Sequence, residues 1–268
     1  MVRMAEIYQL LIICPLIFIA SIIDAIAGSA SIISIPTYLV VGIPVHYAYG
    51  THKFVTFWGM LVSALRYIKN KQYELKLVIM FSVLCMLGTY VGSKLILCIN
   101  DIYLRYALIF LISVFFIISI IKKYRTSKKE NVTKKRETIK LLEILSPRKK
   151  LVLSLFIGLV IGLYGGTIGI GTTSILILIF IKIFNIDQVK AAGNARIINC
   201  LLNLVAMITF LLDKKIMFAV AIPATISSML GNYIGAGLAM KKANKIIEPM
   251  LKIIFCILFI ELIIETIF

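Results

Sequence analysis

Two short clusters of polar side chains, each containing one cation, stand out in a chain that is otherwise strongly apolar. The first cluster contains Thr51, His52 and Lys53, and the second, in the other half of the chain, contains Asn194 and Arg196. Each opens an apolar segment of about 20 residues, which is long enough to cross a bilayer. A cation buried in a membrane is costly unless water or an anion compensates it. We therefore expect Lys53 and Arg196 to bind a small anion; the alternative is that their long side chains reach lipid headgroups.

Two further asparagines, Asn199 and Asn203, extend the second cluster. Their spacing from Arg196 places all three residues on one side of a helix. We expect them to line the same anion site, together with Thr51 and Asn194 from the openings of the two segments. The alternative is that each asparagine only hydrogen-bonds to a neighbouring membrane helix.

Asp24 is a single acid inside the first apolar segment. It could take up a proton during transport, pair with Lys53 or His52, or cap the short helix that follows. If the bound anion crosses the membrane at this site, we expect Asp24 and His52 to be the groups that couple its movement to a proton gradient, with sodium as the other candidate coupling ion.

Glycine-rich stretches precede the second apolar segment of each half: DAIAGSAS at 24–31 and YGGTIGIGTTS at 164–174. We expect the backbone to leave helical geometry near Gly28 and Gly171, because irregular backbone at membrane depth is tolerated only within protein or against a polar cavity. A short helix that starts after each break points free N–H groups into the protein and can cradle an anion. Hydroxyl donors stand at these breaks: Ser29, Ser31, Thr172 and Thr173.

The elements that must position these residues repeat along the chain. A shift of 143 positions, which we call the repeat register, superimposes four glycines and one tyrosine of the first half (Gly28, Gly50, Gly88, Tyr90, Gly92) on identical residues of the second. Apolar segments lie near 8–27, 31–42, 47–66, 75–98 and 103–121, with counterparts near 151–170, 173–184, 193–212, 216–238 and 246–267. Since each half has about five segments, an odd number, the halves should have opposite orientation. The sequence predicts an all-α integral membrane protein with two inverted-topology repeats and short or broken helices at the glycine-rich points.

The charge distribution divides the chain and orients it. Of its 29 basic residues, 12 lie in the polar stretch 122–150, which contains only three acids. Basic loops stay in the cytoplasm, so we expect the first repeat to span 1–121, a cytoplasmic linker 122–150 and the second repeat 151–268, with both termini outside the plasma membrane. The linker has no recognisable nucleic-acid-binding fold, and we expect no nucleic acid partner. The five cysteines show no metal-ligand spacing, and we expect neither a metal nor a cofactor.

The stretch SIIDAIAGSASIISIPTYLVVGIPVHYAYGTHKF resembles the first-half signature of the sulfite exporter TauE/SafE family, in which a glycine-rich run precedes a short proline-containing segment and A-x-G-T-N-K. The second half resembles the matching pattern, and the resemblance covers essentially the whole chain. The chain departs from the family pattern in three places: Ser29 to Ser31 replace glycines, His52 replaces asparagine, and Gly165-Gly166 stands where an acidic residue often follows tyrosine.

The resemblance implies a secondary transporter, in most cases an exporter, of sulfite, sulfoacetate or another small sulfur-containing anion. Alternating access between the two repeats would move the anion. Two alternatives stay open: a passive anion channel, and a membrane-embedded enzyme, for which the sequence offers no constellation of catalytic groups. The identity of the anion, the direction of transport and the oligomeric state are left open by the sequence.

Overall fold

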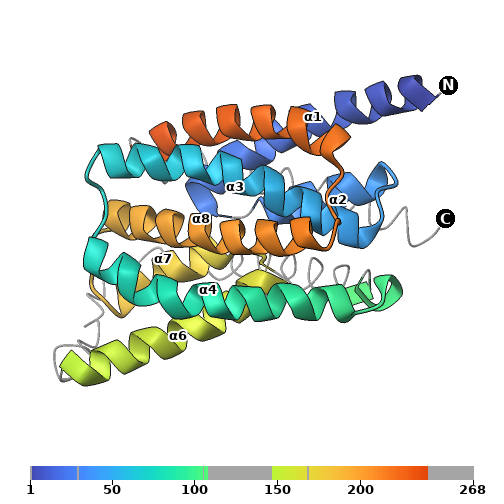
Figure 1. Cartoon of the computed structure of the whole chain (residues 1–268). Helices are drawn as coiled ribbons and strands as arrows, with labels where there is room; N and C mark the ends of the chain where they lie inside the picture. Colours follow the sequence, from blue (N-terminus) through green and yellow to red (C-terminus); the bar gives the residue numbers. More distant parts are fainter. Residues whose placement is uncertain (1, 29, 105, 108–146, 168, 241–268) are drawn as a thin grey trace, which may run out of the picture.

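A computed structural model describes residues 2–28, 30–104, 106–107, 147–167 and 169–240 (Figure 1). All the elements in these ranges are helices. The expected segment 246–267, most of the expected segment 103–121 and most of the linker 122–150 lie outside the described residues.

The first half contains helices α1 (Val2–Ala27), α2 (Ser31–Val40), α3 (Val45–Lys69) and α4 (Leu75–Cys98). The second half repeats this order with α6 (Pro147–Thr167), α7 (Thr172–Lys182), α8 (Gln188–Leu212) and an unlabelled helix, Phe218–Met240. In each half a short second helix of 10 or 11 residues follows a glycine-rich break. This confirms the expected all-α fold with short helices.

Within the described ranges, four stretches are long and apolar enough to cross a membrane: Gln9–Ile26, Leu75–Cys98, Gln188–Leu212 and Phe218–Met240. Large apolar side chains cover the outward faces of α4 and the helix Phe218–Met240, at positions that match in the repeat register. In α4 they are Ile79, Val83, Leu87, Tyr90 and Val91, and in the later helix Ile222, Ile226, Leu230, Tyr233 and Ile234. Apolar stripes this extensive are costly in water but suit contact with lipid tails. The composition and the outward-facing residues both indicate a protein embedded in a bilayer.

The spacing between matching helices changes once along the chain. Helices α3 and α8 begin at Val45 and Gln188, which match in the repeat register. The short helices α2 and α7 begin at Ser31 and Thr172, and here the shift is 141 rather than 143. The second half therefore has two extra residues between its break and its third helix. The uniform shift of 143 expected from the sequence is wrong for the first two helices of each half.

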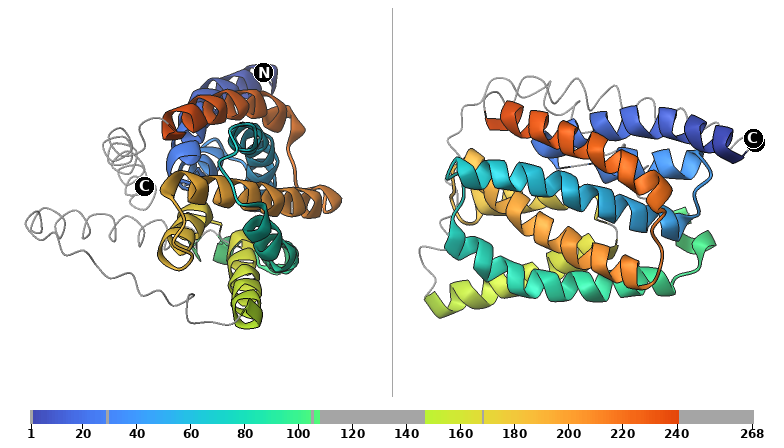
Figure 2. Two further views of the ribbon diagram at one scale, coloured as in Figure 1. Left: turned by 90° about the vertical axis from the view of Figure 1, so that its left-hand side faces the viewer. Right: turned by 45° about the horizontal axis from the view of Figure 1, so that its top comes forward.

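Glycines bring helices of different halves into backbone contact. Gly88 and Gly92 of α4 pack against the backbone of α6, where Gly162 and Gly166 return the contact. Likewise, Gly231 and Gly235 of the helix Phe218–Met240 pack against the backbone of α1, and the two helices lie side by side in Figures 1 and 2. Small residues four apart allow this close approach between membrane helices.

Helices α3 and α8 form the centre of the molecule and run antiparallel (Figure 1). The start of α3 lies at the end of α8, because Gly50 packs on the carbonyl group of Lys215. The start of α8 lies at the end of α3, because Gly193 packs on the carbonyl group of Gln72. Gly50 matches Gly193 in the repeat register, and Gln72 matches Lys215. Such an exchange of partners is what a two-fold relation between the halves produces.

Candidate functional site

Both helix breaks are held open by glycines in the left-handed conformation. Gly28 has a φ of 75°, and Gly169 and Gly171 have φ of 68° and 70°. Glycine adopts this conformation without the penalty that a Cβ atom imposes. Gly28 and Gly169 each precede the short helix by three residues, so Gly169 rather than Gly171 is the structural counterpart of Gly28.

The two breaks meet each other. A Cβ atom on Gly28 would overlap the Cβ atom of Thr173, in the first turn of α7. Asn199 of α8 fixes this threonine, because its Nδ2 donates a 2.6 Å hydrogen bond to Thr173 Oγ1. The two glycine-rich stretches, far apart in the sequence, are therefore neighbours in the fold.

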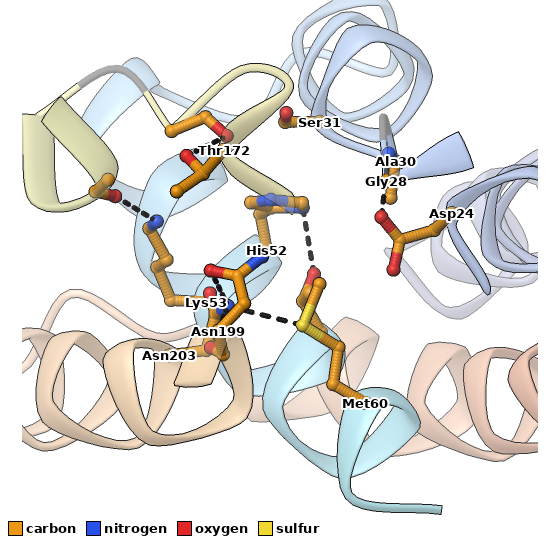
Figure 3. Close-up of a pocket in the computed structure, with 13 residues that line it drawn as sticks. Asp24, Gly28, Ala30, Ser31, His52, Lys53, Met60, Thr172, Asn199 and Asn203 are labelled. Carbon is orange, nitrogen blue, oxygen red and sulfur yellow. Dashed lines mark hydrogen bonds between the residues drawn. The ribbon is translucent and has the colours of Figure 1, made fainter. Parts of the chain in front are cut away.

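A polar cavity of about 20 Å³ lies where the breaks meet, between α3 and α8 (Figure 3). It has room for one or two water molecules. Its lining draws on both breaks and on the two central helices: Asp24, Gly28, Ala30, Ser31, His52, Lys53, Thr56, Met60, Gly165, Gly169, Thr172, Asn199 and Asn203. Many of the residues expected from the sequence line this cavity: Asp24, Gly28, Ser31, His52, Lys53, Thr172, Asn199 and Asn203. Ser29 lies outside the described residues.

Lys53 is the exceptional residue of this lining. Its side chain is only 5% exposed, and its Nζ donates a 2.8 Å hydrogen bond to the carbonyl oxygen of Gly165 (Figure 3). That carbonyl belongs to the last turn of α6, where backbone acceptors lack helical partners. None of the carboxylates in the described part of the chain lies within ion-pair distance of Lys53. The result is a buried cation with a single neutral partner.

Arg196 has a different environment. Its Nη1 lies 2.6 Å from Oδ2 of Asp24, and both side chains are 2% exposed. The other oxygen of Asp24 accepts a hydrogen bond from the backbone N–H of Ala30, 3.1 Å away, at the start of α2. Asp24 therefore stabilises the short helix, as one alternative from the sequence suggested, while its charge partner is Arg196 rather than Lys53 or His52. Arg196 does not line the cavity itself and lies behind Asp24.

His52 contacts two hydroxyl groups through Nδ1: Ser34 Oγ at 2.7 Å and Thr56 Oγ1 at 3.2 Å. Ser34 also donates to the carbonyl oxygen of Ala30. The imidazole is therefore tied to α2 and α3, beside Lys53. Among the described residues there is no cluster of three or more His, Cys, Asp or Glu side chains that could hold a metal ion.

Thr51 and Asn194 bind turns of the opposite half and do not line the cavity. Thr51 Oγ1 accepts a hydrogen bond from the backbone N–H of Met217, and Asn194 Oδ1 accepts one from the N–H of Glu74. Glu74 and Met217 again match in the repeat register. These side chains hold the two halves together at opposite ends of the α3–α8 pair.

Sequence reasoning missed several lining residues, among them Gly165, Gly169, Thr56 and Met60. Gly165 contributes a backbone carbonyl, which has no signature in the sequence. Met60 could have been found from the repeat, because it matches Asn203 in the repeat register. These two meet where α3 crosses α8, with Asn203 Nδ2 donating to Met60 Sδ at 3.4 Å.

The chain is similar to several curated proteins that are named as membrane transporters. A "Probable membrane transporter protein" of Haemophilus influenzae is 30% identical over 239 residues, covering 88% of this chain and 87% of the relative. A "Probable membrane transporter protein ORF9" of Sinorhizobium sp is 27% identical, with 91% and 88% covered. A "Probable membrane transporter protein YfcA" of Escherichia coli K12 is 22% identical, with 92% and 87% covered. No solved structure matches the chain significantly.

Helices long enough to cross a membrane surround a buried polar centre, and the relatives are named as membrane transporters. Together these observations place the chain in the class of membrane transporters. Residues 13–262 match the family described as "Sulfite exporter TauE/SafE". The chain belongs to this family, which confirms the resemblance recognised in its motifs.

Proposed function

We propose that the chain is a secondary transporter that carries a small anion through the cavity where the two helix breaks meet. The observation that carries this proposal is Lys53, a buried cation that lines the cavity and has only a carbonyl oxygen as its partner. An uncompensated cation at this depth is stabilised most directly by an anion. The cavity marks the place where that anion would bind, and it must widen to admit a sulfur oxyanion, because it has room for only one or two water molecules.

Neutral polar groups surround Lys53 in the cavity lining, among them the amide groups of Asn199 and Asn203 and the hydroxyl groups of Ser31 and Thr172. Thr172 and the two asparagines already donate hydrogen bonds within the protein, so they would have to exchange some of these bonds for bonds to the anion. Helices α2 and α7 both begin at the cavity wall, and the N-terminus of a helix favours negative charge. An oxyanion matches this set, because several oxygen atoms can accept hydrogen bonds at once.

We propose an alternating-access mechanism, in which two inverted repeats expose the site first to one side of the membrane and then to the other. The exchanged contacts at Gly50 and Gly193 and the antiparallel run of α3 and α8 support it. A two-fold axis that relates antiparallel membrane-spanning helices lies in the plane of the membrane. A passive channel would instead need a continuous path for the ion, and the dependence of flux on ion gradients separates it from a carrier.

The family's description points to sulfite, and sulfoacetate or another organosulfonate has the same oxygen acceptors. We propose export driven by a proton or sodium gradient, with the linker 122–150 in the cytoplasm and both termini outside. Asp24 and His52 are the titratable groups of the lining besides Lys53, and they are our candidates for proton coupling.

Sulfite flux in proteoliposomes tests the proposal. Glutamine at Lys53 keeps a donor for the carbonyl group of Gly165 and removes the charge. We expect Lys53→Gln to fold and insert but to lose flux by about tenfold or more, since a hydrogen bond to a charged group contributes about 1.5–3 kcal/mol. Lys69→Gln, on an exposed position of the same helix, is the matched control and should keep its flux.

Near-normal flux in Lys53→Gln would mean that Lys53 only caps the end of α6, and the proposed anion site would be wrong. Flux that depends on neither a proton gradient nor a sodium gradient would indicate a passive channel rather than a carrier.

A further inference from the structure

The two halves can be compared residue by residue at the site through their glycine contacts. Gly92 packs against the carbonyl oxygen of Leu163, and Gly235, its match in the repeat register, packs against that of Ile22. Ile22 and Leu163 are related by the same shift of 141 that relates the starts of α2 and α7. In the first helix of each half, position 24 therefore corresponds to position 165.

This correspondence makes Gly165 the counterpart of Asp24. Lys53 and Arg196 are also counterparts, in the repeat register. Lys53 contacts Gly165 and Arg196 contacts Asp24, so each cation contacts the corresponding position of the opposite half. Arg196 meets a carboxylate oxygen of Asp24 at 2.6 Å, whereas Lys53 meets the backbone carbonyl oxygen of Gly165 at 2.8 Å. The fold offers two equivalent places for an acid, and this chain fills only one of them.

The consequence is an unequal distribution of charge. Asp24 and Arg196 form a buried pair whose formal charges cancel. With His52 counted as neutral, because two adjacent buried cations would repel each other, Lys53 leaves the cavity with one positive charge. Asp24 also lines the cavity, so a ligand bound to Lys53 shares the space with the carboxylate of the Asp24–Arg196 pair.

We propose that this cavity selects oxyanions with a single negative charge, such as bisulfite or a monosulfonate, over dianions of similar size. The inference rests on the proposed function and specifies its substrate class. Lys53 compensates one charge of the ligand, and the neutral amides and hydroxyls bind the remaining oxygen atoms. Among the described residues that line the cavity, a second negative charge finds no further lysine or arginine. It also meets the carboxylate of Asp24, and although Arg196 offsets part of that charge from behind, placing like charges side by side is unfavourable.

Gly165 offers a direct test, because a Cβ atom fits at its position. A Cβ atom there would lie 3.5 Å from Thr172 Cγ2 and 3.9 Å from Leu202 Cδ1, which are ordinary contacts. The neighbouring Gly166, by contrast, packs on the backbone of Thr89. Gly165→Asp places a carboxylate beside Lys53 and completes the second acidic position. Gly165→Asn has nearly the same shape without the charge.

Isothermal titration of the purified full-length protein with methanesulfonate and with sulfate measures the selection, because both ligands are tetrahedral sulfur oxyanions that differ in charge. We expect methanesulfonate to bind about tenfold more tightly than sulfate, or better. Gly165→Asp should weaken methanesulfonate binding by about tenfold or more, while Gly165→Asn should stay close to the parent protein.

Sulfate binding as tight as methanesulfonate binding, or equal losses in Gly165→Asp and Gly165→Asn, would overturn the charge selection and leave anion transport intact. If the parent protein binds neither these ligands nor sulfite, the proposed function fails, and the inference fails with it.

Discussion

Alanine at Gly28 tests whether the site depends on contact between the two helix breaks. Gly28 has a φ of 75°, and a Cβ atom in this left-handed region costs about 1–2 kcal/mol. The same atom would overlap the Cβ atom of Thr173 and lie 3.0 Å from the backbone nitrogen of Ser174. Overpacking of this kind adds about 1–3 kcal/mol, which brings the total to about 2–5 kcal/mol.

Gly42 provides a matched control. Its φ is 84°, also left-handed, but no atom lies within 4 Å of where its Cβ would be. Gly42→Ala therefore bears only the backbone cost of about 1–2 kcal/mol. The difference between the two variants isolates the contact at Thr173, and we expect it to be about 1–3 kcal/mol.

Thermal unfolding of the detergent-purified protein and sulfite flux in proteoliposomes measure the two effects. At about 2–4 °C per kcal/mol for a chain of this length, Gly28→Ala should melt about 2–12 °C below Gly42→Ala. It should also lose flux, because the shift of α7 moves Thr172 at the cavity wall. If the two variants have the same melting temperature and the same flux, the breaks do not support each other and this account of the site is refuted.

The remaining predictions concern the buried ion pair and the topology. Asp24→Asn leaves Arg196 without a buried counter-ion and should destabilise the protein by about 3–5 kcal/mol, while Asp24→Asn combined with Arg196→Gln should recover much of that loss. Melting temperatures of the single and double variants decide this, and strictly additive losses would contradict it. A tag after Phe268 should be accessible from outside and a cysteine probe within 125–145 only from the cytoplasm. Labelling of the tag from the cytoplasm would exclude the inverted arrangement.

Much of the fold could be predicted from the sequence because its causes are local. Apolar segments of membrane length and glycine-rich interruptions leave direct traces in composition, so the all-α fold and the short helices were predicted correctly. The matching of Gly28 with Gly171 was less accurate. The two extra residues between the second break and α8 shift the correspondence to Gly169, and no residue type marks such an insertion in an apolar chain.

The site was less accessible to prediction, because its contacts join distant parts of the chain. Lys53, Arg196 and Asp24 could be singled out as charges that a membrane tolerates poorly. The partners of these charges could not be predicted, because Asp24 and Arg196 lie in different halves of the sequence and Lys53 binds a backbone carbonyl. The role of each asparagine also depended on the three-dimensional arrangement, because Asn194 accepts a hydrogen bond from the backbone of Glu74 while Asn199 donates one to Thr173.

The glycine contacts bear on which parts of the molecule can move. Because α4 meets α6 backbone to backbone, and α1 meets the helix Phe218–Met240 in the same way, neither pair can slide without losing its close packing. Each pair contains one helix from each half of the sequence. We therefore expect each pair to move as one body assembled from both halves, with relative motion between the two pairs. Domain boundaries drawn along the chain would cut through both of these bodies.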